Sequence, residues 1–344
     1  MTNTLTPTTT PPTIGILYPG AMGAGLARTL HARAPALRLL TAVGARSPET
    51  RERAAAAGLE DLPLAQVVAE ADILVSILPP ASALPLAREV AALLAASGRP
   101  KRPIYVELNA VSPATMGDIA AALGPETPLV DGSVIGLPPK EGYDPRVYLS
   151  SAPEWGPQLA HVAALLSQGW TVRVLHKGGA GGASALKMCH GGTQKGATGL
   201  AALLVLAAHA HSPDTAAALL EQLADTKPDQ VWRLGGSLPD MIPKAYRVRC
   251  GPVQADTQWV AEMEEISSFV TSSLGLDPAD TNTPAAAHLG LARVFERVAA
   301  GLRASAGAVG AAAEGEAGNA EEVETLKAWA ARGRETLTAR GYAP

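Results

Sequence analysis

One lysine, in the stretch GGASALKMCHGG at 181–192, stands in surroundings that favour acid–base chemistry. Ser184 is a good N-cap residue, which places Lys187 in the first turn of a helix. The positive end of a helix disfavours an ammonium ion, so the pKa of this amine falls toward the range of a usable base. No acidic residue lies three or four positions away to pair with it. The alternative is a lysine whose amine simply reaches solvent.

The helical face of Lys187 carries further polar positions, at 190, 191, 194 and 198. A lone histidine on such a face, here His190, is as often structural as functional.

A glycine-rich turn, GILYPGAMGAG at 15–25, follows a short apolar run. In the dinucleotide-binding pattern G-x-G-x-x-G, the second glycine lets the backbone approach the pyrophosphate and the third packs helix on strand. Gly20 and Gly23 keep these two positions, whereas Tyr18 replaces the first glycine. The alternative is a tight turn with a structural role alone. The expected cofactor contacts are Gly20, Ala21, Met22 and Gly23.

The end of the second predicted strand indicates which cofactor the chain prefers. An acid there would bind the ribose 2′-hydroxyl of NAD, but Arg46 and Ser47 occupy the place. A guanidinium beside a hydroxyl suits a 2′-phosphate, which predicts NADP, with NAD as the alternative. Arg46 could also be an ordinary surface arginine. Leu78 and Pro79, at the end of the apolar run 72–80, are further expected cofactor contacts.

Short apolar runs alternate with helical segments through the first half of the chain. The runs at 13–18, 37–44, 72–80, 103–111 and 128–136 predict buried parallel strands, with one or two edge strands after residue 145. From Ala183 onward the periodicity is helical. We therefore expect a disordered leader at 1–12, an α/β Rossmann-type domain at 13–178 and an all-helical domain at 179–344.

Breaks in the helical half are expected at Pro213, Pro228, the Gly235–Gly236 pair and Pro243, and a mobile Ala/Gly/Glu loop at 304–320.

Composition restricts the class of protein. Charged residues make up 17% of the 344 and aromatic residues 4%, and the net charge is −4, which argues against a nucleic-acid partner. Two cysteines cannot build a disulfide framework, and the leader resembles no secretory signal. The longest apolar run, GLAALLVLAAHA, is short for a membrane span. We expect a soluble, cytoplasmic protein without a metal site.

Three segments resemble the β-hydroxyacid dehydrogenase and 6-phosphogluconate dehydrogenase superfamily, including 3-hydroxyisobutyrate dehydrogenases. They are the glycine turn with its Met-Gly pair, DGSVIG at 131–136, which resembles the substrate loop, and the Lys187 segment. PKAYR and AEMEEI resemble a C-terminal domain of unassigned function found in this group. The resemblance implies that Lys187 takes the proton of a substrate hydroxyl while hydride goes to a nicotinamide. It also implies a homodimer, because relatives bury the helix after this lysine between subunits.

The resemblance assigns further residues to the site. Asn109 matches a position between nicotinamide and substrate, where an Asx turn is the alternative, and Ser133 lies in the substrate loop. Relatives usually have Ser-Gly-Gly where this chain has Ile135, Gly136 and Leu137, so hydrogen-bond donors are lost and apolar surface is gained.

Three other positions also depart from the superfamily pattern. Gly191 replaces an asparagine expected to hold the substrate, and Gln194 replaces a glutamate that acts as an acid in decarboxylating relatives. Together with His190, which matches the family histidine, the resemblance implies that these residues contact the substrate. Glu264 stands where relatives often have a cofactor-side lysine, and Lys244 and Arg247 are the candidate substitutes.

The sequence therefore favours an NADP-dependent oxidoreductase that interconverts a small β-hydroxy compound and its keto form, without decarboxylation. An NADPH-dependent imine reductase and a cofactor-binding protein that has lost turnover are the alternatives. The retained lysine favours an enzyme, because an inert binding protein has no need of it.

Overall fold

The computed structural model describes residues 12–245, 258–305 and 314–342. The chain divides into two compact units, Met1–Met188 and Cys189–Pro344, and each is described by itself below.

The first unit contains one eight-stranded sheet, in the order β3-β2-β1-β4-β5-β6-β7-β8. Among the described strands, the β6–β7 pair is the only antiparallel one. The first six positions of this order are those of a doubly wound dinucleotide-binding sheet, so the predicted fold class is confirmed. The strands are β1 Thr13–Leu17, β2 Arg38–Thr41, β3 Glu60–Asp61, β4 Ile73–Ser76, β5 Ile104–Glu107, β6 Leu129–Ile135, β7 Arg146–Ser150 and β8 Thr171–Val174.

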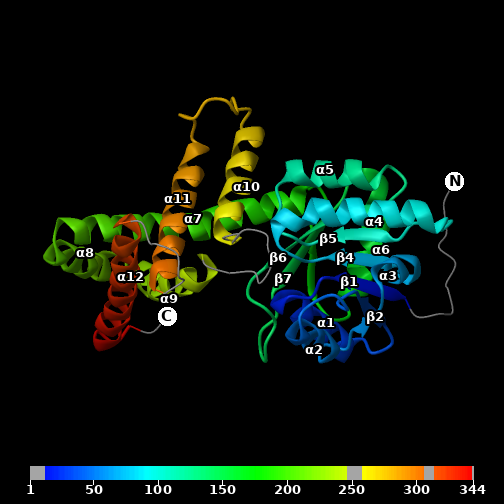
Figure 1. The fold of residues 1–344 in the computed structure, drawn as a ribbon, viewed down its shortest axis with the longest axis horizontal. Coiled ribbons are helices and arrows are strands. Elements are labelled where there is room, and N and C mark those ends of the chain that lie inside the picture. The colour runs from blue at the N-terminus through cyan, green and yellow to red at the C-terminus, as the bar shows by residue number, and fades with distance from the viewer. Residues whose placement is uncertain (1–11, 246–257, 306–313, 343–344) are drawn as a thin grey trace. The chain divides into compact units, whose positions relative to one another are not determined.

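Helices cover both faces of this sheet (Figure 1). One face packs against α1 Ala21–Arg33, α2 Pro48–Ala55 and α6 Gly156–Leu166. The other packs against α3 Leu64–Glu70, α4 Ala83–Ser97 and α5 Pro113–Leu123. Burial on both faces explains why the strand sequences are continuous apolar runs rather than alternating ones.

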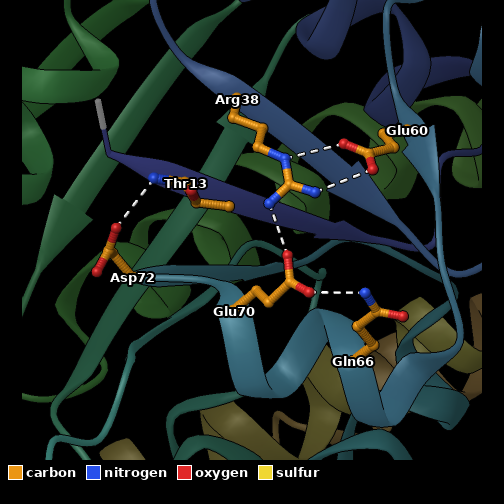
Figure 2. Close-up of polar contacts among 6 residues, drawn as sticks. All are labelled: Thr13, Arg38, Glu60, Gln66, Glu70 and Asp72. Carbon is orange, nitrogen blue, oxygen red and sulfur yellow. Dashed lines mark hydrogen bonds and ion pairs between the residues drawn. The ribbon is translucent and has the colours of Figure 1, made fainter. Parts of the chain in front are cut away.

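Polar contacts occupy the amino-terminal edge of the sheet (Figure 2). The Arg38 guanidinium lies 2.9 Å from each carboxylate oxygen of Glu60 and 2.6 Å from Glu70. The Thr13 N–H donates to Asp72 at 3.0 Å. Thr13, Arg38 and Glu60 begin their strands, Asp72 directly precedes β4, and Glu70 ends α3, so this edge is used for structure. The carboxyl-terminal edge carries the predicted cofactor residues.

The second unit is helical throughout the part of it that the structure describes. Its helices are the greater part of α7 Gly182–His211, then α8 Pro213–Thr226, α9 Pro228–Ala245, α10 Gln258–Ser273, α11 Ala286–Ser305 and α12 Glu314–Ala339. No helix in the described ranges combines the length and apolar character needed to cross a bilayer.

Several sequence expectations about local structure need correction. Pro213 and Pro228 begin helices as expected, but Gly235, Gly236 and Pro243 lie inside α9. The two glycines are tolerated there because Arg334 of α12 packs so closely that a Cβ at either would lie 2.6 Å from its side chain. The loop expected at 304–320 is wrong for its first two residues, which end α11, and for its last seven, which begin α12.

Two expected segments lie outside the described residues, and two short elements were not expected from the sequence. The leader through residue 11 and residues 306–313 lie outside the described part. The short strand β3 and helix α3 were not anticipated, because their two and seven residues carry too little periodicity.

Candidate active site

The predicted cofactor residues gather at the carboxyl-terminal edge of the sheet. Strands β1, β2, β4, β5 and β6 run parallel, so the segments that follow them all emerge at this edge. These are the positions at which doubly wound sheets bind ligands.

The turn after β1 leaves open space beside its second fingerprint glycine. A Cβ built on Gly20 meets no atom within 4 Å, and no side chain of the described residues caps α1 at this end. A Cβ at Gly23 would instead lie 2.8 Å from Ile77 of the neighbouring strand end. Gly20 thus leaves room for a phosphate at a helix N-terminus, while Gly23 allows close packing.

Neighbouring residues of this turn differ in exposure. Ala21 is exposed, whereas Met22 is partly buried against the core that α1 covers.

The loop after β2 presents Arg46 and Ser47 to solvent. The Arg46 guanidinium lies over the ring of Tyr18, 4.4 Å from its centroid. Ser47 is the N-cap residue of α2, and its hydroxyl lies 3.2 Å from that of Thr50. A guanidinium, two hydroxyls and a helix N-terminus therefore lie together, a donor set suited to a phosphate.

Sequence reasoning missed two residues of this region. Arg53 of α2 donates to the Thr50 hydroxyl at 3.1 Å and to the Pro19 carbonyl at 3.5 Å, so it links α2 to the glycine turn. Asp61, at the end of β3, accepts the Val43 N–H at 2.7 Å. The helical spacing of Thr50 and Arg53 was the available signal for the first. The sequence held no signal for Asp61, because β3 itself was not anticipated.

Asn109, directly beyond β5, is buried and bonded within the protein. Its carboxamide oxygen accepts the Leu78 N–H at 2.5 Å, and its amide nitrogen donates to the Ser76 hydroxyl at 2.9 Å. These bonds run to the neighbouring strand end rather than forming an Asx turn. Asn109 therefore fixes the Leu78–Pro79 segment, which is where the sequence predicts cofactor contacts.

A row of four buried polar residues crosses the sheet at this edge. Ser76, Glu107, Asp131 and Ser150 are register partners on β4, β5, β6 and β7 in turn. Burial raises the pKa of Glu107 to about 8, and the Asp131 carboxylate beside it acts in the same direction. Glu107 is thus neutral at pH 7. Burial raises the pKa of Asp131 as well, but the hydrogen bonds that it accepts from Ser184 and Ser150 oppose this shift and favour the ionised form.

Asp131 joins β6 to the start of α7. Its carboxylate accepts the Ser184 hydroxyl at 2.6 Å, the Ser184 N–H at 3.0 Å and the Ser150 hydroxyl at 3.0 Å. The Ala183 N–H in turn donates to Ser150 at 3.0 Å. A carboxylate at a helix N-terminus also interacts favourably with the helix dipole. The predicted N-cap is wrong, because α7 begins at Gly182, so that Ser184 is its third residue and Lys187 lies in its second turn. Asp131 instead accepts hydrogen bonds from the N–H and the hydroxyl of Ser184.

Lys187 lies one turn further along α7 and reaches back to β6. Its Nζ donates to the Val134 carbonyl at 2.7 Å. Desolvation by burial lowers the pKa of the amine to about 8. The sequence predicted this direction of shift from the helix end; the structure gives burial as its cause.

The β6 segment positions the predicted substrate loop. Ser133 is fully buried, and its hydroxyl has no hydrogen-bond partner among the described residues. Gly136 has φ +133°, a conformation that side chains disfavour. The Leu137 N–H donates to the Tyr143 hydroxyl at 3.1 Å, so one of the loop's remaining donors is already used. Ile135 is partly buried, while the Leu137 side chain is 56% exposed.

The other predicted substrate residues belong to the second unit. His190 and Gln194 are exposed, whereas Gly191 is buried with Ile266 3.6 Å from the place of a Cβ. The Thr198 hydroxyl is used within the protein, by the Gln194 carbonyl at 3.1 Å and by Ser237. The predicted helical face is therefore partly packed and partly open.

The structure describes no side-chain position for Lys244 or Arg247, the two residues expected to replace the cofactor-side lysine. Glu264 is exposed on α10. The Lys244 side chain and all of Arg247 lie outside the described residues.

Comparison with known proteins agrees with this fold. Residues 210–298 match the family model described as a domain of unknown function, DUF1932. No curated protein matches the chain. Conserved protein MTH1747, of unknown function and described as structurally similar to 3-hydroxyacid dehydrogenases, is 23% identical over 83% of this chain and 96% of its own, with a TM-score of 0.58.

Two further solved structures are similar. A conserved hypothetical protein from Sinorhizobium meliloti 1021 is 23% identical over 93% of this chain and 97% of its own, with a TM-score of 0.57. The 3-hydroxyisobutyrate dehydrogenase (ygbJ) from Salmonella typhimurium is 19% identical over 85% and 95%, also with a TM-score of 0.57. The chain thus has a 3-hydroxyacid dehydrogenase-like fold and carries a DUF1932 domain. The resemblance predicted from the sequence is confirmed in these two respects.

Proposed function

We propose that this protein is an NADP-dependent oxidoreductase that interconverts a small β-hydroxy compound and its keto form by hydride transfer, with Lys187 as the general acid/base. The observation that carries the proposal is the partly buried amine of Lys187, held against β6 near the ligand-binding edge of a doubly wound sheet. The fold of the 3-hydroxyacid dehydrogenase-like structures supports the same class of reaction, by analogy of fold.

The residues present fit a dinucleotide. Open space beside Gly20 admits the pyrophosphate to the N-terminus of α1, and the Arg46–Ser47 loop suits a 2′-phosphate. We include Ala21, Met22 and Gly23 of the turn among the proposed contacts. Asn109 acts on this site by fixing the Leu78–Pro79 segment. Bound NADP supplies the acceptor or donor of the hydride.

Lys187 supplies the proton step. In the oxidation direction its neutral amine takes the proton of the substrate hydroxyl, and the resulting ammonium is held by the Val134 carbonyl. In the reduction direction the ammonium returns that proton to the carbonyl oxygen. A pKa of about 8 makes both forms accessible near neutral pH. Gln194 cannot serve as an acid, so this chemistry ends at dehydrogenation.

We further propose the substrate side of the site. Within the first unit, the proposed contacts are Ser133, Ile135 and Gly136. The proposed substrate roles of His190, Gly191 and Gln194 rest on the superfamily resemblance alone. The Leu137 side chain is exposed, and the Leu137 N–H already donates to the Tyr143 hydroxyl. Both features favour a substrate that is less anionic, or more apolar, than 6-phosphogluconate or hydroxyisobutyrate. Turnover should be tested with aryl and alkyl β-hydroxy compounds, their ketones and cyclic imines. Turnover of the imines alone would replace the proposed reaction with imine reduction.

Arg46→Ala should erase the preference for NADP over NAD. We expect the parent protein to bind NADP about ten- to a hundredfold more tightly, because a charge-assisted phosphate contact contributes roughly 1.5–3 kcal/mol. Titration calorimetry with both cofactors measures the ratio. Arg51→Ala, which removes an exposed arginine of the following helix α2, is the matched control and should keep the ratio. Equal affinities in the parent protein would refute the prediction.

We also propose that the protein is a homodimer through α7. Leu200, Leu203 and Leu204 form one stripe on this helix and are 52%, 46% and 53% exposed in the single chain. An apolar stripe of this kind on a helix is expected to be covered.

Leu204→Glu should convert the dimer into a monomer, because it buries a carboxylate in an apolar interface. Sedimentation velocity at micromolar concentration gives the mass of each. Leu274→Glu, at a leucine 64% exposed elsewhere in the second unit, is the control and should remain dimeric. A parent protein that sediments as a monomer rules the dimer out.

A further inference from the structure

Tyr18 occupies the place of the first fingerprint glycine, and its side chain is built into the structure. The ring is partly buried against the core that α3, α4 and α5 cover, and it lies under the Arg46 guanidinium. Burial raises the pKa of the phenol, and Glu89 acts in the same direction, while Arg46 opposes both. The phenol is therefore neutral at physiological pH.

The turn forms without a glycine at this position. The Gly20 N–H donates to the Tyr18 carbonyl at 2.9 Å, which closes the turn around Pro19. No residue other than glycine has a positive φ in the described part of the chain, so Tyr18 does not need the left-handed conformation that favours glycine. Arg53 further braces the turn through the Pro19 carbonyl. The tight turn that the first glycine usually permits therefore forms with a tyrosine at position 18.

We propose that Tyr18 is a specificity-determining residue, which holds Arg46 in the orientation that binds the cofactor's 2′-phosphate. This inference rests on the proposed preference for NADP. The guanidinium carbon lies 4.4 Å from the ring centroid, and a side-chain hydrogen bond with Arg46 lowers the pKa of the phenol. The ring therefore restricts the guanidinium, while its remaining N–H groups stay available to a phosphate.

Stacking also lowers the entropic cost of binding. Arg46 is exposed, and an exposed arginine side chain loses considerable rotamer freedom when it grips a ligand. A ring that already holds the guanidinium removes part of this cost before the ligand arrives. The effect acts on ligands with a 2′-phosphate and leaves those without one unchanged, which distinguishes it from a general contribution to the turn.

The test uses 2′,5′-ADP and 5′-AMP, which differ at the 2′-phosphate, with titration calorimetry of the full chain. Parent protein should prefer 2′,5′-ADP, and Tyr18→Leu should reduce that preference about two- to fivefold, the range of an exposed cation–π contact. Affinity for 5′-AMP should not change. Tyr18→Phe keeps the ring and should keep the parent's preference. Tyr18→Gly, which restores the fingerprint residue, is a second ring-free variant and should behave like Tyr18→Leu.

A double variant tests whether Tyr18 acts through Arg46. In the Arg46→Ala background, Tyr18→Leu should cause no further loss of preference. The inference is overturned if the ring-free variants keep the parent's preference, or if they weaken both ligands equally. A parent without any preference for 2′,5′-ADP overturns it together with the NADP assignment, while the role of Lys187 is still judged separately by turnover.

Discussion

Lys187→Ala should lower turnover about 10²- to 10⁴-fold, the usual contribution of a positioned acid–base group. Cofactor affinity should be unchanged, because the pyrophosphate is expected at Gly20 and the N-terminus of α1 rather than at the amine. Steady-state kinetics on any accepted substrate, with calorimetry for NADP, separate the two effects. Lys187→Arg should be nearly as slow, since a guanidinium does not release its proton near neutral pH.

Lys177→Ala is the matched control, because this lysine is exposed on the same unit. It should turn over at the parent rate. A Lys187→Ala variant as fast as the parent would remove Lys187 from the mechanism.

The pH dependence of the parent provides a second readout of Lys187. Oxidation needs the neutral amine, so its rate should rise with pH and level off above the lysine pKa of about 8. Reduction needs the ammonium, so its rate should fall over the same range. The residual activity of Lys187→Ala should show neither this rise nor this fall with pH.

Asp131→Ala should destabilise the first unit by about 3–5 kcal/mol, the range for removing one partner of a buried, charge-assisted network. The variant leaves the Ser184 N–H and the hydroxyls of Ser184 and Ser150 without their acceptor. The start of α7 then loses its attachment to β6, so Lys187 should also lose its position. Chemical denaturation followed by circular dichroism measures the stability, and residual turnover measures the second effect.

Asp118→Ala removes an exposed acid of α5 and should change stability by less than about 0.5 kcal/mol. Asp131→Asn keeps one acceptor oxygen and should fall between the parent and Asp131→Ala. If Asp131→Ala is as stable as the control, the network is not what holds α7 to the sheet.

The apolar runs of the first half predict the sheet, because strands buried on both faces must be apolar along their whole length. The glycine turn, Arg46, Ser47 and Lys187 could likewise be found from the sequence, since residue type and distance from a predicted strand or helix end are local features. Local periodicity was too short to reveal β3 and α3, and with β3 the position of Asp61 was lost.

Only the tertiary structure determined how these residues are held. The row from Ser76 to Ser150 joins four strands that lie far apart in the sequence, and strand order alone makes them neighbours. Asn109 was expected to face a ligand, but pairing of β4 with β5 brings its side chain to Leu78 and Ser76. Tyr18 and Arg46 meet because β1 and β2 pair in parallel, so the segments that follow them leave the same edge. A sequence states which groups are present; long-range strand pairing decides which of them touch.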